Sequence, residues 1–193
     1  MLTLLCIGQK NAGKGRIDVF NPEMHNHAIE TMQIENDLLT AIENNQLFIH
    51  YQPVIDVENN IIEGFEALLR WEHPLLGNIS PERFIPIAEN IGQIKKLGKW
   101  VLENACSQVN EWNMQFSPKK KLTIAVNLSG IQVVSKGLEK TIKEVIKSTK
   151  IHANELYLEV TETMLVKEKE LAKKSIKAIR ELGVSTSIDD FGK

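Results

Sequence analysis

Four strand-like segments of this chain each carry a carboxylate or an amide side chain at or near their ends. These residues are Glu66 in IIEGFEALLRW, Asn127 in LTIAVNLS, Glu159 in ELYLEVTE, and Asp189 with Asp190 in VSTSIDD. Helix-like segments separate the later strands, and such alternation predicts a parallel sheet or a (β/α) barrel. Barrels of this kind perform their chemistry at the carboxyl ends of the strands, which is where these side chains fall.

The direction of the side chains supports a shared site. Residues two apart on a strand share a face, so Asn127 lies with Ala125, and Asp189 lies with Ser187, opposite a largely apolar face. One acidic strand end is explained well enough by exposure to solvent, but four such ends favour a common function. Hard oxygen ligands of this kind predict a Mg²⁺ or Mn²⁺ site.

Composition excludes several classes of function. The 193 residues suffice for one well-buried domain, and a net charge of −2 provides no basic surface for DNA or RNA. Two cysteines without a recognisable secretory leader favour a cytoplasmic location. The longest apolar stretch, residues 2–7, is too short to span a bilayer, so we expect no membrane segment in this chain, although a longer parent could be membrane-anchored.

A helix is predicted at residues 25–45, ahead of the main domain. Its apolar residues recur at roughly helical spacing and are expected to form one stripe, namely Ala28, Ile29, Met32, Leu38, Leu39 and Ile42. An isolated helix of this length is marginal in water. We therefore expect the stripe to pack against the main domain or against a second copy of the chain.

The main domain is expected to begin with two strands and then to alternate helices and strands. The strands are predicted at 47–56, 60–71, 122–128, 155–161 and 184–189. Helices are predicted after Ser80-Pro81-Glu82, which offers a cap and a first-turn proline, and then at 94–112, 137–148 and 167–182.

Together these segments resemble the EAL domain family, the bacterial phosphodiesterases that hydrolyse cyclic di-GMP on a β/α barrel. The resemblance runs from about Leu38 to Gly192 and is carried by six ordered motifs: YQP at 51–53, EALLRW at 66–71, SPERFIPIAE at 80–89, NLSG at 127–130, EVTET at 159–163 and DDFG at 189–192. Residues 12–26 also resemble the tail of a GGDEF (diguanylate cyclase) domain and the linker that often precedes an EAL domain.

The resemblance implies a two-metal Mg²⁺ or Mn²⁺ site. The residues that would bind the first metal are Glu66, Asn127, Glu159 and Asp189; Asp189 would bridge to the second metal, with Asp190 beside it. Gln52, Leu68 and Arg70 would contact the dinucleotide, and Glu162 would steady the loop over the metals. The expected catalytic set is therefore Glu66, Asp189, Asp190 and Glu162, and the implied activity is hydrolysis of cyclic di-GMP to linear pGpG.

The resemblance also implies that an EAL domain continues beyond DDFG. The expected fold is thus an incomplete TIM-type α/β barrel with about five of its eight strands, preceded by the linker helix. We expect a GGDEF remnant at 1–24, the linker helix at 25–45 and a partial EAL domain at 46–193, a fragment inactive alone. Two alternatives stay open: a non-catalytic cyclic di-GMP receptor, and an interaction module without enzymatic activity. EAL domains commonly dimerise, so a homodimer is a further expectation.

Overall fold

The structure, a computed structural model, describes residues 22–161 and 169–189 of the chain. Most of the expected GGDEF remnant, together with Glu162 and Asp190, lies outside the described residues, and the side chain of Asp189 does so too.

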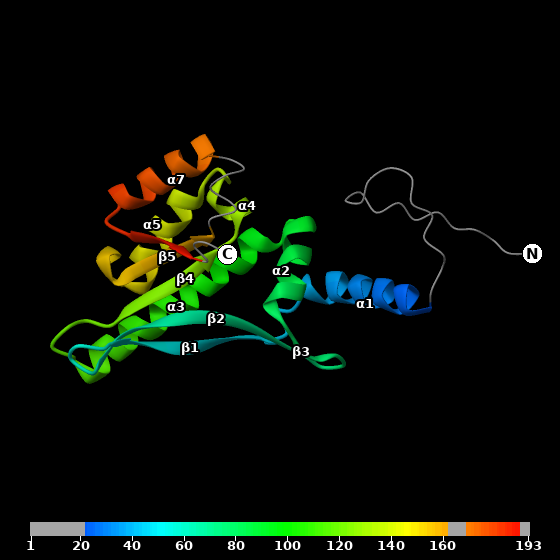
Figure 1. Cartoon of the computed structure of the whole chain (residues 1–193), viewed down its shortest axis with the longest axis horizontal. Helices are drawn as coiled ribbons and strands as arrows, with labels where there is room; N and C mark the ends of the chain where they lie inside the picture. The colour runs from blue at the N-terminus through cyan, green and yellow to red at the C-terminus, as the bar shows by residue number, and fades with distance from the viewer. Residues whose placement is uncertain (1–21, 162–168, 190–193) are drawn as a thin grey trace, which may run out of the picture.

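One mixed sheet organises the described residues (Figure 1). Its strands are β1 (Leu47–Asp56), β2 (Ile61–His73), β3 (Gly77–Ile79), β4 (Thr123–Leu128), β5 (Leu156–Thr161) and β6 (Ser185–Asp189). They follow the order β1-β2-β4-β5-β6, and the short β3, which was not predicted, pairs with β2. β1 and β3 run antiparallel to β2, whereas β2, β4, β5 and β6 run parallel to one another. The predicted α/β architecture is confirmed.

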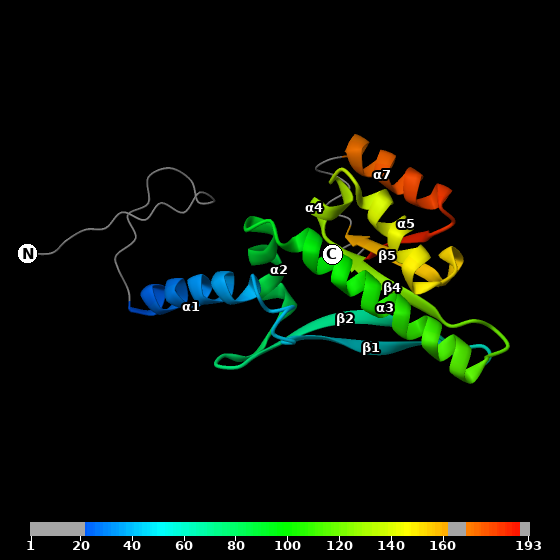
Figure 2. The same cartoon turned by 180° about the vertical axis from the view of Figure 1, so that it is seen from behind.

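Helices pack on one face of this sheet (Figures 1 and 2). They are α2 (Pro81–Asn90), α3 (Ile94–Phe116), α4 (Gly130–Val133), α5 (Leu138–Thr149) and α7 (Lys169–Glu181), with a short 3₁₀ turn at Ala153–Glu155. The predicted helices at 137–148 and 167–182 agree with α5 and α7 within two residues at either end. Ser80 occupies the N-cap position of α2, and Pro81 begins the helix, as predicted.

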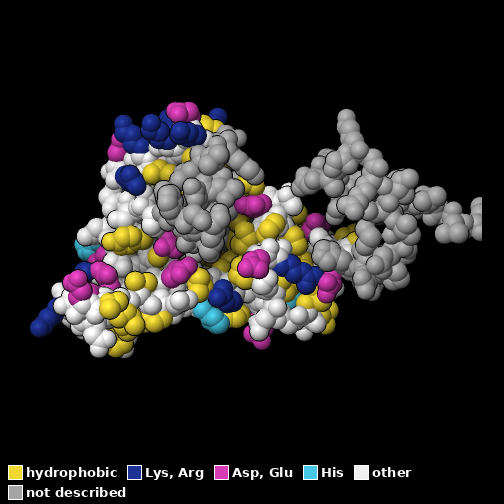
Figure 3. Space-filling model, viewed as in Figure 1, with side chains coloured by type: hydrophobic (Ala, Val, Ile, Leu, Met, Phe, Trp, Pro, Cys, Tyr) yellow, Lys and Arg dark blue, Asp and Glu magenta, His cyan; other side chains and the backbone are white. Residues whose placement is uncertain are grey.

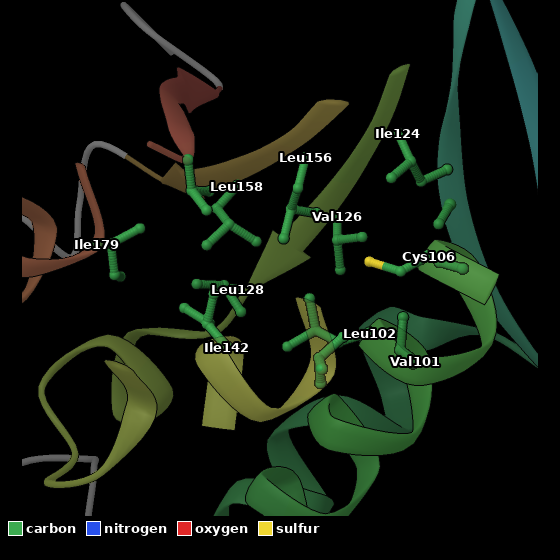
Figure 4. Close-up of a cluster of buried hydrophobic side chains, with 14 of the residues drawn as sticks. Val101, Leu102, Cys106, Ile124, Val126, Leu128, Ile142, Leu156, Leu158 and Ile179 are labelled. Carbon is green, nitrogen blue, oxygen red and sulfur yellow. The ribbon is translucent and has the colours of Figure 1, made fainter. Parts of the chain in front are cut away.

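The core lies between the helices and the apolar face of the parallel strands (Figure 4). Alternate residues of β4 and β5, such as Ile124, Val126 and Leu158, are almost fully buried, and they face Leu102 and Cys106 of α3. Because strand side chains alternate, burying these residues turns Asn127 and Glu159 to the opposite face. Packing of the core therefore decides where the polar face lies.

The first helix, α1 (Pro22–Leu38), is shorter than predicted at its C-terminal end. Residues 39–45 form turns instead of helix, with the N–H of Gln46 donating to the carbonyl of Ala41 at 3.0 Å. The carbonyl of Gln46 then accepts from Glu72 N–H at 2.9 Å, so pairing with β2 ends the helix early.

The predicted apolar stripe of α1 is only partly correct. Leu38 is buried, but Ile29, Met32 and Leu39 are 50%, 62% and 45% exposed, and Ala28 is exposed as well. The buried residues are Ile34 and Leu38 of α1 and Ala41 in the turns that follow it; they pack with Trp71 and Phe84, and the predicted Ile42 packs beside them, partly buried. Ile34 and Leu38 are four residues apart and so lie on one face of α1. The helix does pack against the main domain, but along a neighbouring face.

Polar contacts hold α1 and the segment that follows it in place. The indole N–H of Trp71 donates to Gln46 Oε1 at 3.1 Å, and Arg83 of α2 forms an ion pair with Glu30 of α1.

Among the described residues, none of the helices combines the length and the apolar character needed to cross a bilayer.

Candidate metal and substrate site

The register of the sheet places the predicted ligands side by side. Asn127 of β4 pairs directly with Glu159 of β5, and Glu159 pairs with Ser187 of β6. Glu66 of β2 pairs with Ala125, two residues before Asn127 on the same face. Asp189 ends β6 and pairs with Thr161, two residues beyond Glu159. All four predicted first-metal ligands therefore stand on adjacent parallel strands, within two register positions of one another.

Glu66 and Asn127 are in direct contact. The amide nitrogen Nδ2 of Asn127 donates a hydrogen bond of 2.8 Å to Oε1 of Glu66. On the next strand pair, Ser187 Oγ donates to Glu159 Oε1 at 3.5 Å. Asn127 is exposed, and Glu66 and Glu159 are half-buried, so a small ligand can reach this face.

The donor set fits a hard divalent cation. The Glu66–Asn127 hydrogen bond uses Oε1 and Nδ2, so Glu66 Oε2 and Asn127 Oδ1 remain suited to bind a metal. Within residues 28–160 and 169–187, whose side chains are described, no three His, Cys, Asp or Glu residues form a metal-sized group. The further acidic members of the predicted set, Asp189 and Asp190, have no described side chains.

The predicted substrate contacts lie on the β1–β2 hairpin. Gln52 pairs with Glu66, and Leu68 and Arg70 follow Glu66 on the same face of β2. An open groove is lined by Gln52, Leu68 and Arg70 together with His50 and the aromatic residues Tyr51, Phe65 and Trp112. Arg70 donates from Nη1 to its neighbour's carbonyl, Leu69 O, at 2.9 Å, which holds the guanidinium close to the strand. The three predicted residues are thus brought together.

The aromatic wall of this groove is apolar and uncharged. Tyr51 packs edge-on against Trp112, with ring centroids 5.0 Å apart. Burial raises the pKa of the Tyr51 phenol to about 12, so this side chain stays protonated at neutral pH.

Charge is unevenly distributed over the molecule. Figure 3 shows Lys and Arg side chains gathered over α7, whereas acidic side chains are spread over the centre of the same view. The basic residues of α7 are exposed to solvent.

A glycine that the sequence analysis did not single out permits the Glu66–Asn127 contact. Gly64 pairs with Thr123 where β2 meets β4, and a Cβ on Gly64 would lie 2.2 Å from Thr123 Oγ1 and 2.5 Å from its carbonyl oxygen. No side chain larger than hydrogen fits this approach, which fixes the spacing of the two strands two residues before Glu66. A glycine inside a strand run is the signal that could have revealed it.

The fold and the polar strand ends define a β/α protein with a candidate divalent-metal site beside a groove. The chain belongs to the EAL domain family, whose model matches residues 35–193.

Several characterised proteins are similar to it. It is 37% identical over 183 residues to the bifunctional diguanylate cyclase/cyclic di-GMP phosphodiesterase MucR of Pseudomonas aeruginosa, covering 95% of this chain and 26% of MucR. It is 39% identical to the oxygen sensor protein DosP of Escherichia coli, covering 95% of this chain and 23% of DosP. The chain therefore spans about a quarter of the length of the curated relatives it matches.

Solved structures agree with the fold. A structure of the MucR phosphodiesterase in complex with c-di-GMP superimposes with a TM-score of 0.77 at 38% identity, covering 83% of this chain and 64% of that one. The EAL enzyme Bd1971, in its cAMP- and cyclic-di-GMP-bound form, gives a TM-score of 0.78 at 27% identity, covering 89% and 47% respectively.

Proposed function

We propose that this chain is part of a metal-dependent phosphodiesterase that hydrolyses cyclic di-GMP to linear pGpG. The observation that carries the proposal is the contact between Glu66 and Asn127, with Glu159 in register beside Asn127. Membership of the EAL family and the cyclic di-GMP phosphodiesterase activity named for MucR support the same conclusion.

The proposed metal ligands are Glu66, Asn127, Glu159, Asp189 and Asp190. A bound divalent cation of the Mg²⁺ or Mn²⁺ type neutralises charge on the phosphodiester and lowers the pKa of water at the site. Asn127 has a second task that its geometry supports, since its amide N–H orients the Glu66 carboxylate. Glu162 is proposed to steady the loop over this site.

The proposed substrate contacts offer a charged group, a polar amide and an apolar surface. Arg70 offers a planar guanidinium suited to a phosphate oxygen, and Gln52 offers an amide that both donates and accepts. Leu68 offers an apolar surface on the same strand face between Glu66 and Arg70. These side chains would hold the phosphodiester beside the proposed metal ligands and limit the access of bulk water.

The test is Mn²⁺-dependent conversion of cyclic di-GMP to pGpG, followed by chromatography. Two proteins are compared: this chain, and a version in which the remaining strands of the MucR phosphodiesterase domain complete the barrel. In the completed version we expect Glu66→Gln to abolish turnover, and Glu63→Gln to preserve it, because Glu63 lies on the same strand but pairs with Lys120 away from the site. Binding of cyclic di-GMP without turnover in both proteins would instead indicate a receptor, and no binding would indicate an interaction module.

We also propose that the chain is a piece of a tandem cyclase–phosphodiesterase protein, inactive by itself. The match with MucR covers 95% of the chain and so extends ahead of residue 35, where the family match begins. MucR itself is a diguanylate cyclase as well as a phosphodiesterase, which supports the proposed remnant at 1–24. In the described part of the chain β6 pairs with β5 alone, so further strands could extend the sheet there.

A homodimer and a cytoplasmic location complete the proposal. The exposed apolar residues Ile29 and Met32 of α1 are compatible with a second copy of the helix, and Met32→Asp should then lower the mass measured by light scattering. An unchanged mass would contradict the dimer and leave the enzymatic proposal intact. The cysteine content supports the location.

A further inference from the structure

Gln132 closes the turn that follows Asn127. It lies in α4, two residues after that helix begins, and is only 5% exposed. Its Oε1 accepts from Ser129 N–H at 3.0 Å, and its own N–H donates to Ser129 Oγ at 3.4 Å. This reciprocal pair ties the start of α4 to Ser129, which is two residues beyond Asn127.

The amide of Gln132 lies against bare backbone of another helix. Gly98 is in α3, and a Cβ at this position would lie 1.8 Å from Gln132 Nε2 and 2.9 Å from its Cδ. Any larger residue at 98 would therefore displace the amide from its place. Gly98 thus provides the space that Gln132 needs to reach back to Ser129.

The backbone between the Gln132–Ser129 hydrogen-bonded pair and Asn127 has little room to move. The only intervening residue is Leu128, which is 4% exposed and belongs to the main core. Val133, beside Gln132, is fully buried in the same core. Because both ends of the short turn are held, a shift of Gln132 must be passed to Ser129 and to the strand end that carries Asn127.

We propose that Gly98 and Gln132 are positioning residues for the metal site. The Gln132 amide, seated against Gly98, fixes the turn after β4 and thereby directs the Asn127 side chain toward Glu66. This inference rests on the proposed function, because it assigns a task to residues that support the proposed ligands. Neither residue touches metal or substrate.

The first test measures Mn²⁺ affinity of the full chain by calorimetry. We expect Gly98→Ala and Gln132→Ala each to weaken binding by roughly 10- to 100-fold, the range typical of outer-shell partners. The double variant should bind no more weakly than Gln132→Ala, because the new methyl group meets no amide once the glutamine is shortened. Ser107→Ala, on the exposed side of α3, is the matched control and should bind Mn²⁺ normally.

A second measurement needs no metal. The side-chain amide of Asn127 gives its own ¹H–¹⁵N NMR signal, which reports the hydrogen bond to Glu66. Gly98→Ala should shift this signal in the same direction as Glu66→Ala does, while the melting temperature shows that the variant is folded. A purely structural role for Gly98 would change the melting temperature and leave the signal unmoved.

The outcomes separate this inference from the function on which it rests. If Asn127→Ala weakens Mn²⁺ binding but folded Gly98→Ala and Gln132→Ala do not, the positioning role is refuted and the metal site stands. If Asn127→Ala also leaves Mn²⁺ affinity unchanged, the metal site itself is refuted, and the inference falls with it. Should Gly98→Ala fail to fold, Gln132→Ala decides, since it removes atoms instead of adding them.

Discussion

His73 and Asp37 join the end of β2 to helix α1 through a contact of 2.8 Å between Nε2 and Oδ2. The N–H groups of Leu75 and Leu76 both donate to His73 Nδ1, so the proton of this ring lies on Nε2 and points to Asp37. The His73 side chain is almost wholly buried, at 1% exposure. The imidazole of His73 therefore links the end of β2 to α1 and to the turn that follows β2.

Removing this imidazole should destabilise the fold. We expect His73→Ala to lower the free energy of unfolding by about 1–3 kcal/mol, because it removes a buried side chain together with its hydrogen bonds to Asp37, Leu75 and Leu76. Asp37→Ala should cost less, since that carboxylate is 41% exposed. Urea denaturation measures both, with Glu35→Ala on the same helix as the control. Equal stability of His73→Ala and the unmodified chain would contradict this role.

The two apolar faces of α1 should respond differently to substitution. Ile34 is fully buried and Met32 is 62% exposed. At a concentration where the chain is monomeric, we expect Ile34→Ala to cost about 2–5 kcal/mol of unfolding free energy, and Met32→Ala to stay within about 0.5 kcal/mol. Thermal denaturation of the pair provides an internal comparison. An effect of Met32→Ala as large as that of Ile34→Ala in the monomer would contradict the assignment of Ile34 to the buried face.

Gly64→Ala should disturb the pairing of β2 with β4. The added methyl group would meet backbone atoms of Thr123, which cannot rotate away as a side chain can. We expect a loss of about 1–3 kcal/mol in unfolding free energy and weaker Mn²⁺ binding, because Glu66 lies two residues further along. Thr123→Ala removes the hydroxyl but not the carbonyl, so it should not restore the stability of Gly64→Ala.

Divalent metal should stabilise the folded chain. A ligand at 100 times its dissociation constant adds about 2.7 kcal/mol to the unfolding free energy, so Mn²⁺ should raise the melting temperature and a chelator should reverse the effect. Asn127→Ala should abolish this response, whereas Arg70→Ala should retain it and lose affinity for cyclic di-GMP. Stabilisation of Asn127→Ala equal to that of the unmodified chain would argue for metal binding elsewhere.

The buried thiol predicts a loss of stability at alkaline pH. Burial raises the pKa of Cys106 to about 12, whereas a thiol in an unfolded chain ionises near pH 8.5. Below the unfolded value both states keep the proton; above it only the unfolded chain ionises, so unfolding becomes easier as pH rises toward 12. Between about pH 8.5 and pH 10, the stability of the unmodified chain should fall more steeply than that of Cys106→Ala. Parallel curves would contradict the shift.

Much of the site could be predicted because side chains along a strand alternate between its two faces. In β4 the alternation of Ile124, Val126 and Leu128 with small or polar neighbours indicates which face Asn127 occupies without any knowledge of the fold. The contact of Asn127 with Glu66 could not be predicted in this way. The contact depends on how β2 and β4, about sixty residues apart in the chain, are aligned. Gly64 fixes that alignment because it lets the backbone of β2 approach Thr123 closely.

The length of α1 and its buried face were predicted wrongly for a similar reason, because contacts distant in the sequence decide both. Helical spacing continues through Leu39 and Ile42, so local pattern favours a longer helix, but pairing of Gln46 with Glu72 turns the chain earlier. The buried set of Ile34, Leu38 and Ala41 is also helically spaced, and only the position of Trp71 and Phe84 selects it over the neighbouring stripe. Tertiary contacts decided between two acceptable local solutions.

Because Asn127 pairs directly with Glu159, the register of β4 against β5 sets the positions of two proposed metal ligands. A slip of one residue between β4 and β5 would bring Val126 or Leu128 opposite Glu159 and would turn a buried side chain toward water. The same event would thus dismantle the ligand set and open the core. Insertions and deletions in these strands should therefore be far less tolerated than substitutions. An insertion or deletion variant of β4 or β5 that still folds should have kept the register that aligns Asn127 with Glu159.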